Sequence, residues 1–208
     1  SFPVAVGAGL TQSYSFSVQV NVGSYFPTVT LFEDNVTSTT VPSAIWTTST
    51  NSSANWTVSN NRAYSPPSTY FSDNLDVVSE QKLTTTNSIA LGANPPPLTF
   101  KHWFSTESTY DGGVLEISTN GGTTWTDVRP NIVTGGYTAL MDTSTVLTGR
   151  RAWSGNSGAS FIKTKVNLTP YANQNIKLRF RFNSDLGTKL EGWYIDNIAI
   201  KNQAAVEM

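Results

Sequence analysis

Apolar and polar residues alternate in short stretches along most of the chain. The first clear case is the stretch SYSFSVQVNV, with apolar residues at Tyr14, Phe16, Val18, Val20 and Val22. Such alternation is typical of a strand with one buried face. The stretch GSYFP that follows is typical of a hinge. Residues 1–26 are therefore expected to be either the last strand of a preceding domain, with a linker, or an edge strand added to this one.

From residue 27 onward, short strand-like runs recur between turn-forming sequences. The runs are TVTLFE, NWTVS, STYFS, LDVVSEQKL, LTFKHWFS, GVLEIST, TWTDV, FIKTKVNL, NIKLRFRFNSD and GWYIDNIAIK. The turn formers between them are SPPS, ANPPP, YDGG, NGG and SGNSG. No segment keeps a 3.6-residue period. The pattern predicts that residues 27–208 form an all-β domain, a jelly-roll β-sandwich of two antiparallel sheets.

The amino-acid composition limits the possible location and binding partners of the chain. Charged residues make up 13% of the sequence and Thr, Ser and Asn are abundant, which favours a secreted or cell-surface protein. The net charge of -1 gives no general attraction to nucleic acid. The sequence has no cysteine, which excludes thiolate metal sites and disulfides. It has no apolar run near the roughly 20 residues of a membrane span. The chain begins without Met or a signal-type segment, so we expect a mature or excised piece of a longer protein.

The stretch EGWYIDNIAI places a carboxylate, Asp196, inside an apolar strand. Either face of that strand would bury the acid, and a buried carboxylate needs hydrogen-bond donors, a cation or a metal. A second acid, Glu33, shares its side of a predicted strand with Val29 and Leu31. Both acids are therefore expected to need a partner that compensates their negative charge.

Residues suited to catalysis are few. Alternation places the one histidine, His102, with Leu98, Phe100 and Phe104, which indicates a core or rim residue bonded to a neighbour. Carboxylate pairs for a glycosidase can be formed in principle. The two pairs are Glu107 with Asp111 and Glu116 with Asp127. Glu116 is interpreted as a solvent-facing residue and Asp111 as a turn former, so no enzyme activity is predicted.

Cationic residues alternate on two predicted strands. One strand carries Lys163 and Lys165, and the other carries Lys177, Arg179 and Arg181. If these strands pair, the two stripes merge into a basic patch, joined by Lys101 and Trp103. Such a patch would suit an acidic glycan or an acidic protein segment. The alternative is a solvated sheet face on which Lys and Arg discourage edge aggregation.

An ordered series of motifs carries a family resemblance. The series is LFEDN, PSAIWTTS, NWTVSNNRAYSPPSTYFSDN, LTFKHWFSTESTYDGGVLEISTNGGTTWTDV, GRRAWSGNSG and GWYIDNIAI. Over about residues 29–201 it resembles the MAM-like jelly-roll domains of secreted bacterial proteins. These include cleaved-adhesin and choice-of-anchor modules, and domains attached to metalloproteases of the immune-inhibitor and fungalysin types. Animal MAM domains carry paired cysteines that this chain lacks, which favours the bacterial branch.

The resemblance implies a non-catalytic accessory or adhesive domain of a larger protein, binding protein or glycan. The alternatives are a carbohydrate-binding module of a secreted hydrolase and an accessory domain of a secreted metalloprotease. The resemblance also implies structural calcium where the first and last strands meet. The implied ligands are Glu33 and Asp196, then Asp73, with Asp34 and Asn74 as lesser candidates. The alternative is that Glu33 and Asp196 each accept hydrogen bonds from backbone amides at strand ends.

Overall fold

The computed structural model describes residues 2–5, 11–14 and 28–202. The chain divides into two compact units, residues 1–28 with 203–208, and Val29–Asn202. In the first unit, β1 (Phe2–Ala5) and β2 (Thr11–Tyr14) form an antiparallel pair. The strand predicted over residues 13–22 lies, beyond Tyr14, outside the described residues.

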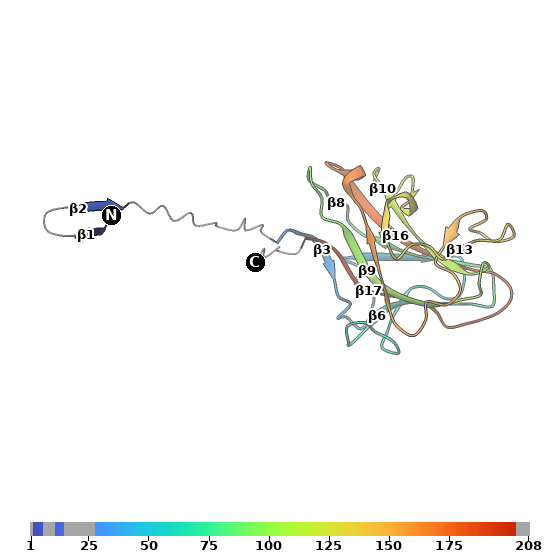
Figure 1. The fold of residues 1–208 in the computed structure, drawn as a ribbon. Coiled ribbons are helices and arrows are strands. Elements are labelled where there is room, and N and C mark those ends of the chain that lie inside the picture. The colour runs from blue at the N-terminus through green and yellow to red at the C-terminus, as the bar shows by residue number, and fades with distance from the viewer. Residues whose placement is uncertain (1, 6–10, 15–27, 203–208) are drawn as a thin grey trace. The chain divides into compact units, whose positions relative to one another are not determined.

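The second unit contains two large antiparallel sheets (Figure 1). The six-stranded sheet has the order β11 (Thr126–Asp127), β10 (Gly112–Ser118), β16 (Asn175–Ser184), β7 (Ser79–Thr85) and β4 (Trp46–Thr50), and β8 (Ile89–Ala90) also pairs with β16. The seven-stranded sheet has the order β12 (Ile132–Thr134), β15 (Ile162–Val166), β9 (Leu98–Ser105), β17 (Gly192–Lys201), β6 (Thr69–Asp73) and β5 (Thr57–Ser59), and β3 (Thr30–Asp34) also pairs with β17.

Short elements complete the unit. Strands β13 (Ala139–Leu140) and β14 (Arg151–Ala152) pair with each other, and two single-turn 3₁₀ helices span Arg129–Asn131 and Thr169–Tyr171. None of the helices in the described ranges has the length and apolar character needed to cross a membrane. The predicted fold class, a jelly-roll β-sandwich of two antiparallel sheets, is confirmed.

The core lies between the two sheets and is rich in aromatic rings. Trp193 of β17 packs edge-on against Phe180 of β16, with ring centroids 6.0 Å apart. Trp153, from the long connection after β12, lies 5.7 Å from Trp193 and is 1% exposed. The loop that carries Trp153 folds inward and places this ring in the core. Edge-to-face aromatic pairs add about 0.5–1.5 kcal/mol beyond the area they bury.

The alternation read from the sequence matches the observed strands closely. Strands β9 and β17 have the predicted limits, and the side chains at Leu98, Phe100, His102 and Phe104 are all buried as expected. Strand β4 was not predicted, because its Thr-rich sequence lacks apolar alternation after Trp46. The central strands follow from side-chain periodicity, and so do the edge strands β5 and β11, whereas the edge strand β4 does not.

Candidate functional site

Strand β17 departs from regular alternation beside Asp196. Its pairing register with β9 shifts between Asp196 and Ala199, and Asn197 takes a left-handed backbone conformation with φ of 48°. Asp196 is fully buried. Its Oδ2 accepts the backbone N–H groups of Tyr64 and Ser65, each at 2.9 Å, and its Oδ1 accepts that of Asn197 at 2.8 Å. Burial raises the pKa of Asp196, and these amide hydrogen bonds oppose the rise.

The predicted partner of Asp196, Glu33, is compensated separately. Glu33 lies on β3 and forms an ion pair with Lys201, which lowers its pKa. Amides and a lysine thus supply the compensation that the sequence assigned to one shared calcium ion. The prediction that Glu33 and Asp196 hold one calcium ion together stays a prediction, and these contacts give each acid partners of its own. For Asp196, the alternative of backbone amides is the one observed.

The other three predicted metal ligands, Asp34, Asp73 and Asn74, make no hydrogen bond with Asp196 and have different surroundings. Asp34 accepts the indole N–H of Trp46 at 2.7 Å and the hydroxyl of Tyr70 at 2.6 Å. Asp73 pairs with Lys189 at 3.2 Å. Asn74 is fully buried, and neither of its side-chain polar atoms has a hydrogen-bond partner among the described residues.

A loop covers the outer face of the seven-stranded sheet, and Asp196 holds it there. The guanidinium of Arg62 lies 3.7 Å from the ring centre of Trp103 and forms a bidentate pair with Glu191. Next to it, the ring of Tyr64 lies 4.2 Å from the ammonium of Lys101. Trp103 is 5% exposed and Tyr64 is 47% exposed. Tyr64, rather than the predicted Trp103, is therefore the aromatic ring that this face offers to solvent.

Three of the predicted ligand-binding lysines lie on the paired strands β9 and β15, and one of them, Lys101, contacts Tyr64. Lys163 of β15 pairs in register with Lys101 of β9, and Lys165 pairs with Thr99. Lys163 and Lys165 are exposed and Lys101 is half-buried. No salt bridge joins these lysines to an acid within residues 28–202. We call Lys101, Lys163, Lys165 and Tyr64 the lysine face.

The second cationic stripe belongs to the other sheet. Lys177, Arg179 and Arg181 lie on β16, which pairs with β10, β7 and β8 and not with β15. The condition under which the stripes would merge is therefore not met, because β15 and β16 belong to different sheets. Lys177 donates to the carbonyl of Thr86 at 2.8 Å.

The two arginines of this stripe are paired with acids and do not point freely into solvent. Arg179 contacts Glu116 at 2.6 Å, and Arg181 contacts Glu80 at 2.6 Å. Glu116 is 3% exposed, although the sequence placed it on a solvent face. It also pairs with Arg150 at 2.7 Å. Burial opposes its charge, but the hydrogen bond from Arg150 and the attraction of Arg179 outweigh this and lower the pKa of Glu116.

The histidine lies in the core, as predicted. His102 is fully buried, and its Nδ1 accepts the indole N–H of Trp193 at 3.1 Å. Its Nε2 therefore carries the proton, which it can donate to Thr164 Oγ1 at 2.9 Å. Burial lowers the pKa of His102 to about 3. The ring is neutral and enclosed, so it cannot act on a bound substrate.

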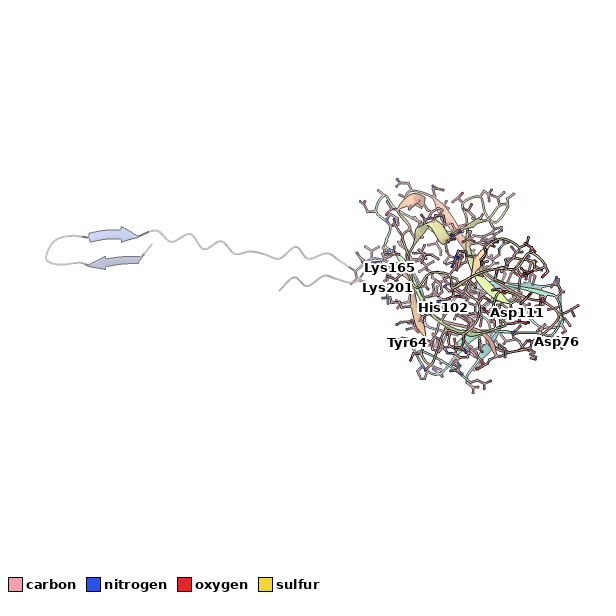
Figure 2. All side chains as sticks on the ribbon, turned by 45° about the vertical axis from the view of Figure 1, so that its right-hand side comes forward. Tyr64, Asp76, His102, Asp111, Lys165 and Lys201 are labelled. Carbon is pink, nitrogen blue, oxygen red and sulfur yellow. The ribbon has the colours of Figure 1, made fainter. Side chains whose placement is uncertain are left out.

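A cluster of acids forms at the end of the sandwich away from the lysine face. Figure 2 shows Asp111 and Asp76 on the opposite side of the unit from Lys165 and Lys201. Oxygen atoms of Glu107, Asp111 and Asp185 all lie within 4.8 Å of one another, the one such group of three metal-ligating side chains among the described residues. Burial raises the pKa of Asp111 to about 6, and the charges of Asp185 and Glu107 add to the rise.

The sequence pointed to part of this cluster. The pair of Glu107 and Asp111 was considered for glycoside hydrolysis, and Asn74 was proposed as a metal ligand elsewhere. Asp185 was not proposed at all. The available signal was position, because Asn74 and Glu107 each follow a predicted strand by two residues and Asp185 is the last residue of another.

The family model of the immune inhibitor A-like MAM domain matches residues 48–207. The chain belongs to this family. Among curated proteins, Bacillopeptidase F of Bacillus subtilis (strain 168) is 25% identical to this MAM domain over 108 residues. The match covers 52% of the chain and 6% of the relative, so the domain spans a small part of that protein's length.

Solved structures share the fold of this MAM domain. The K2 cleaved adhesin domain of Lys-gingipain has a TM-score of 0.50 and 18% identity, with 83% of this chain and 97% of that chain covered. The K3 cleaved adhesin domain of Lys-gingipain from Porphyromonas gingivalis W83 has a TM-score of 0.50 and 12% identity, with coverages of 84% and 99%. At these identities the likeness shows the β-sandwich fold alone.

Proposed function

We propose that this MAM domain is a non-catalytic binding module of a larger secreted or cell-surface bacterial protein, and that it binds an acidic glycan on its lysine face. Family membership supports the accessory role, because the matched family is named for a domain of an immune inhibitor A-like protein. The match to a small part of a bacillopeptidase supports a parent protein of the peptidase type.

The class of ligand is inferred from the positions of three lysines and one ring. Lys101, Lys163 and Lys165 lie on paired strands, and the exposed ring of Tyr64 lies against Lys101. Adjacent cations on neighbouring strands raise the local potential, which attracts anionic groups. The exposed ring of Tyr64 adds an apolar surface on which a sugar can stack. A flat sheet face with cations and one ring suits an extended acidic polysaccharide better than a compact ligand.

The accessory role also requires that the domain has no hydrolytic activity of its own. His102 is enclosed in the core, and Glu116 is held by arginines. We expect the purified chain to release no product from casein or from a panel of polysaccharides. Product release that a carboxylate substitution abolishes would overturn this part of the proposal.

Binding can be measured by biolayer interferometry with polygalacturonate, poly-glutamate and neutral β-1,4-galactan as probes. Polygalacturonate is expected to bind at about 50 mM NaCl and several-fold more weakly at about 150 mM, because the Debye length shortens to about 8 Å. Binding to neither acidic polymer, or equal binding of the neutral galactan at both salt concentrations, would contradict the proposal. Tighter binding of poly-glutamate than of polygalacturonate would mean that the ligand is an acidic polypeptide and not an acidic glycan.

The lysine face is tested by the double variant Lys163→Ser with Lys165→Ser. Both side chains are exposed, so we expect loss of polygalacturonate binding with an unchanged melting temperature. The matched control is Lys82→Ser with Lys189→Ser, which removes the same charge from other positions. The control should bind as the unmodified chain does. Equal loss in both double variants would mean that net charge, and not this face, attracts the ligand.

A further inference from the structure

Three loops bring the acid cluster together at one end of the sandwich. Glu107 and Asp111 lie in the connection between β9 and β10, Asp185 directly follows β16, and Asn74 directly follows β6. Strands β6 and β9 belong to the seven-stranded sheet, whereas β10 and β16 belong to the six-stranded sheet. A ligand held by all of these side chains would therefore join the two sheets.

Backbone hydrogen bonds fix the carboxylates in place. The N–H group of Asp111 donates to the carbonyl of Glu107 at 3.0 Å, so the two acids stand on one turn. The hydroxyl of Ser154 braces that turn by donating to the carbonyl of Glu107 at 3.2 Å and accepting the N–H of Thr109 at 2.9 Å. The N–H of Asp185 donates to Asp111 Oδ1 at 2.8 Å. The acids are held close together by the fold itself.

The surroundings of the cluster add further negative charge. Asp76 and Asp142 lie close enough to raise the pKa of Asp185 further, beyond the effects of its burial and of Glu107. No Lys or Arg forms a salt bridge with Glu107, Asp111 or Asp185 within the described part of the chain. Like charges at such distances repel each other unless a cation or a proton lies among them.

Asn74 gives a second and independent indication of a ligand. Its side chain is fully buried and lies beside Asp111. In the described chain, neither Asn74 Oδ1 nor Nδ2 makes a hydrogen bond, and neither does the buried Oδ1 of Asp185. A buried polar group without a partner costs about 1–3 kcal/mol, so such groups at one place indicate a missing partner.

We propose that Glu107, Asp111, Asp185 and Asn74 bind one calcium ion. The oxygens that accept no hydrogen bond in residues 28–202 are Glu107 Oε1, Asp111 Oδ2, both carboxylate oxygens of Asp185, and Asn74 Oδ1. Calcium takes six to eight oxygen ligands at about 2.3–2.6 Å and accepts irregular geometry, with water completing the shell. Magnesium demands a near-ideal octahedron and keeps more of its water, which suits this irregular set of four side chains less well.

A catalytic role for the same carboxylates fits the structure less well. A glycosidase requires that both acids reach the scissile bond. Asp111 is 1% exposed and already accepts the N–H of Asp185. Gly187 also lies over the cluster, because a Cβ at this position would be 3.0 Å from Glu107 Oε2 and 3.4 Å from Asp185 Oδ1. The buried Asp111 is therefore poorly placed to reach a glycosidic bond, whereas a small ion does not require that access.

Calcium binding can be tested on the full chain by calorimetric titration and by thermal unfolding in EGTA and in calcium. At about 100 times the dissociation constant, calcium should raise the melting temperature by roughly 5–10 °C. In the isosteric variant Asp185→Asn this rise should disappear. In EGTA that variant should melt at or above the temperature of the unmodified chain, because one repelling charge has been removed. The unmodified chain should thus melt higher than the variant in calcium but not in EGTA. This difference distinguishes a metal ligand from an acid that only stabilises the fold.

Two controls complete the test. Glu33→Gln changes the acid at the junction of the first and last strands of the unit and should titrate with calcium as the unmodified chain does. The variant Lys163→Ser with Lys165→Ser should also bind calcium normally, since the lysine face is a separate site. No heat and no melting shift at about 10 mM calcium would overturn the proposal, as would an unchanged calcium response in Asp185→Asn. Loss of the response in Glu33→Gln would also overturn it.

Discussion

The carboxylate of Asp196 accepts the backbone N–H group of Tyr64 at 2.9 Å, although 132 positions separate the two residues. The same carboxylate oxygen accepts the N–H of Ser65. An acid in the middle of an apolar strand thus acts as a clamp for a distant loop. That loop covers Trp103 and presents Tyr64 on the lysine face, so the buried charge shapes the surface proposed to bind ligand.

Replacing Asp196 with Asn should loosen this loop. The amide has one acceptor oxygen where the carboxylate has two, so a backbone N–H group loses its partner. The expected loss in the free energy of unfolding is about 1–3 kcal/mol. Urea unfolding would measure the loss, and hydrogen exchange should rise at Tyr64 and Ser65.

The size of that loss should not depend on calcium. Equal destabilisation in EGTA and in calcium would agree with the amide contacts, whereas a loss seen only in calcium would restore a metal-binding role for Asp196. Glu33→Gln serves as the comparison, because its ion pair with Lys201 is about one-third exposed. Exposed pairs contribute about 0–1 kcal/mol, so this change should cost little.

Glu116 should prove structural. Its carboxylate is nearly inaccessible and contacts Arg150 and Arg179 at 2.7 and 2.6 Å. Glu116→Ala should destabilise the unit by about 3 kcal/mol, toward the lower end for a buried pair because the arginines are partly exposed. Urea unfolding of a double variant, Glu116→Leu with Arg179→Leu, should recover part of the loss. A cost below about 1 kcal/mol would mean that water already solvates these charges.

Gly113 should resist enlargement. Gly113 begins the predicted run GVLEIST and lies within β10, where a Cβ would collide with the indole ring of Trp193. Gly113→Ala should therefore cost about 1–3 kcal/mol through overpacking, measured by thermal unfolding. Gly92→Ala is the matched control, since a Cβ there meets no atom within 4 Å. The control should be neutral or stabilising by up to about 1 kcal/mol.

Side-chain periodicity was sufficient to predict the central strands, because burial on one face imposes alternation directly. It placed His102 in the core and Lys163 and Lys165 outside. It did not reveal which strands pair. The stripes on β15 and β16 look alike in sequence, yet one lies on each sheet, and the register shift after Asp196 has no local signature.

The acid cluster shows a second limit of sequence patterns. Asn74, Glu107, Asp111 and Asp185 are scattered over more than half of the unit and meet because several strands end at the same place. Taken alone, Asn74, Asp111 and Asp185 are ordinary turn formers and Glu107 is an ordinary loop residue. Their common environment depends on strand order and loop packing, which alternation does not encode.

His102 should make stability depend on pH. Its pKa is about 3 in the folded chain, because of burial, and 6.5 is its ordinary value. Below pH 6.5 the unfolded chain therefore binds a proton that the folded chain does not, and stability falls until the pH approaches 3. Between pH 7 and 5 this contributes a loss of about 2 kcal/mol. Asp111, whose pKa is raised to about 6, acts in the opposite direction, so the test is the difference between two proteins. Urea unfolding of His102→Gln should show a smaller loss on acidification than the unmodified chain, and identical pH profiles would mean that the buried imidazole accepts a proton without cost.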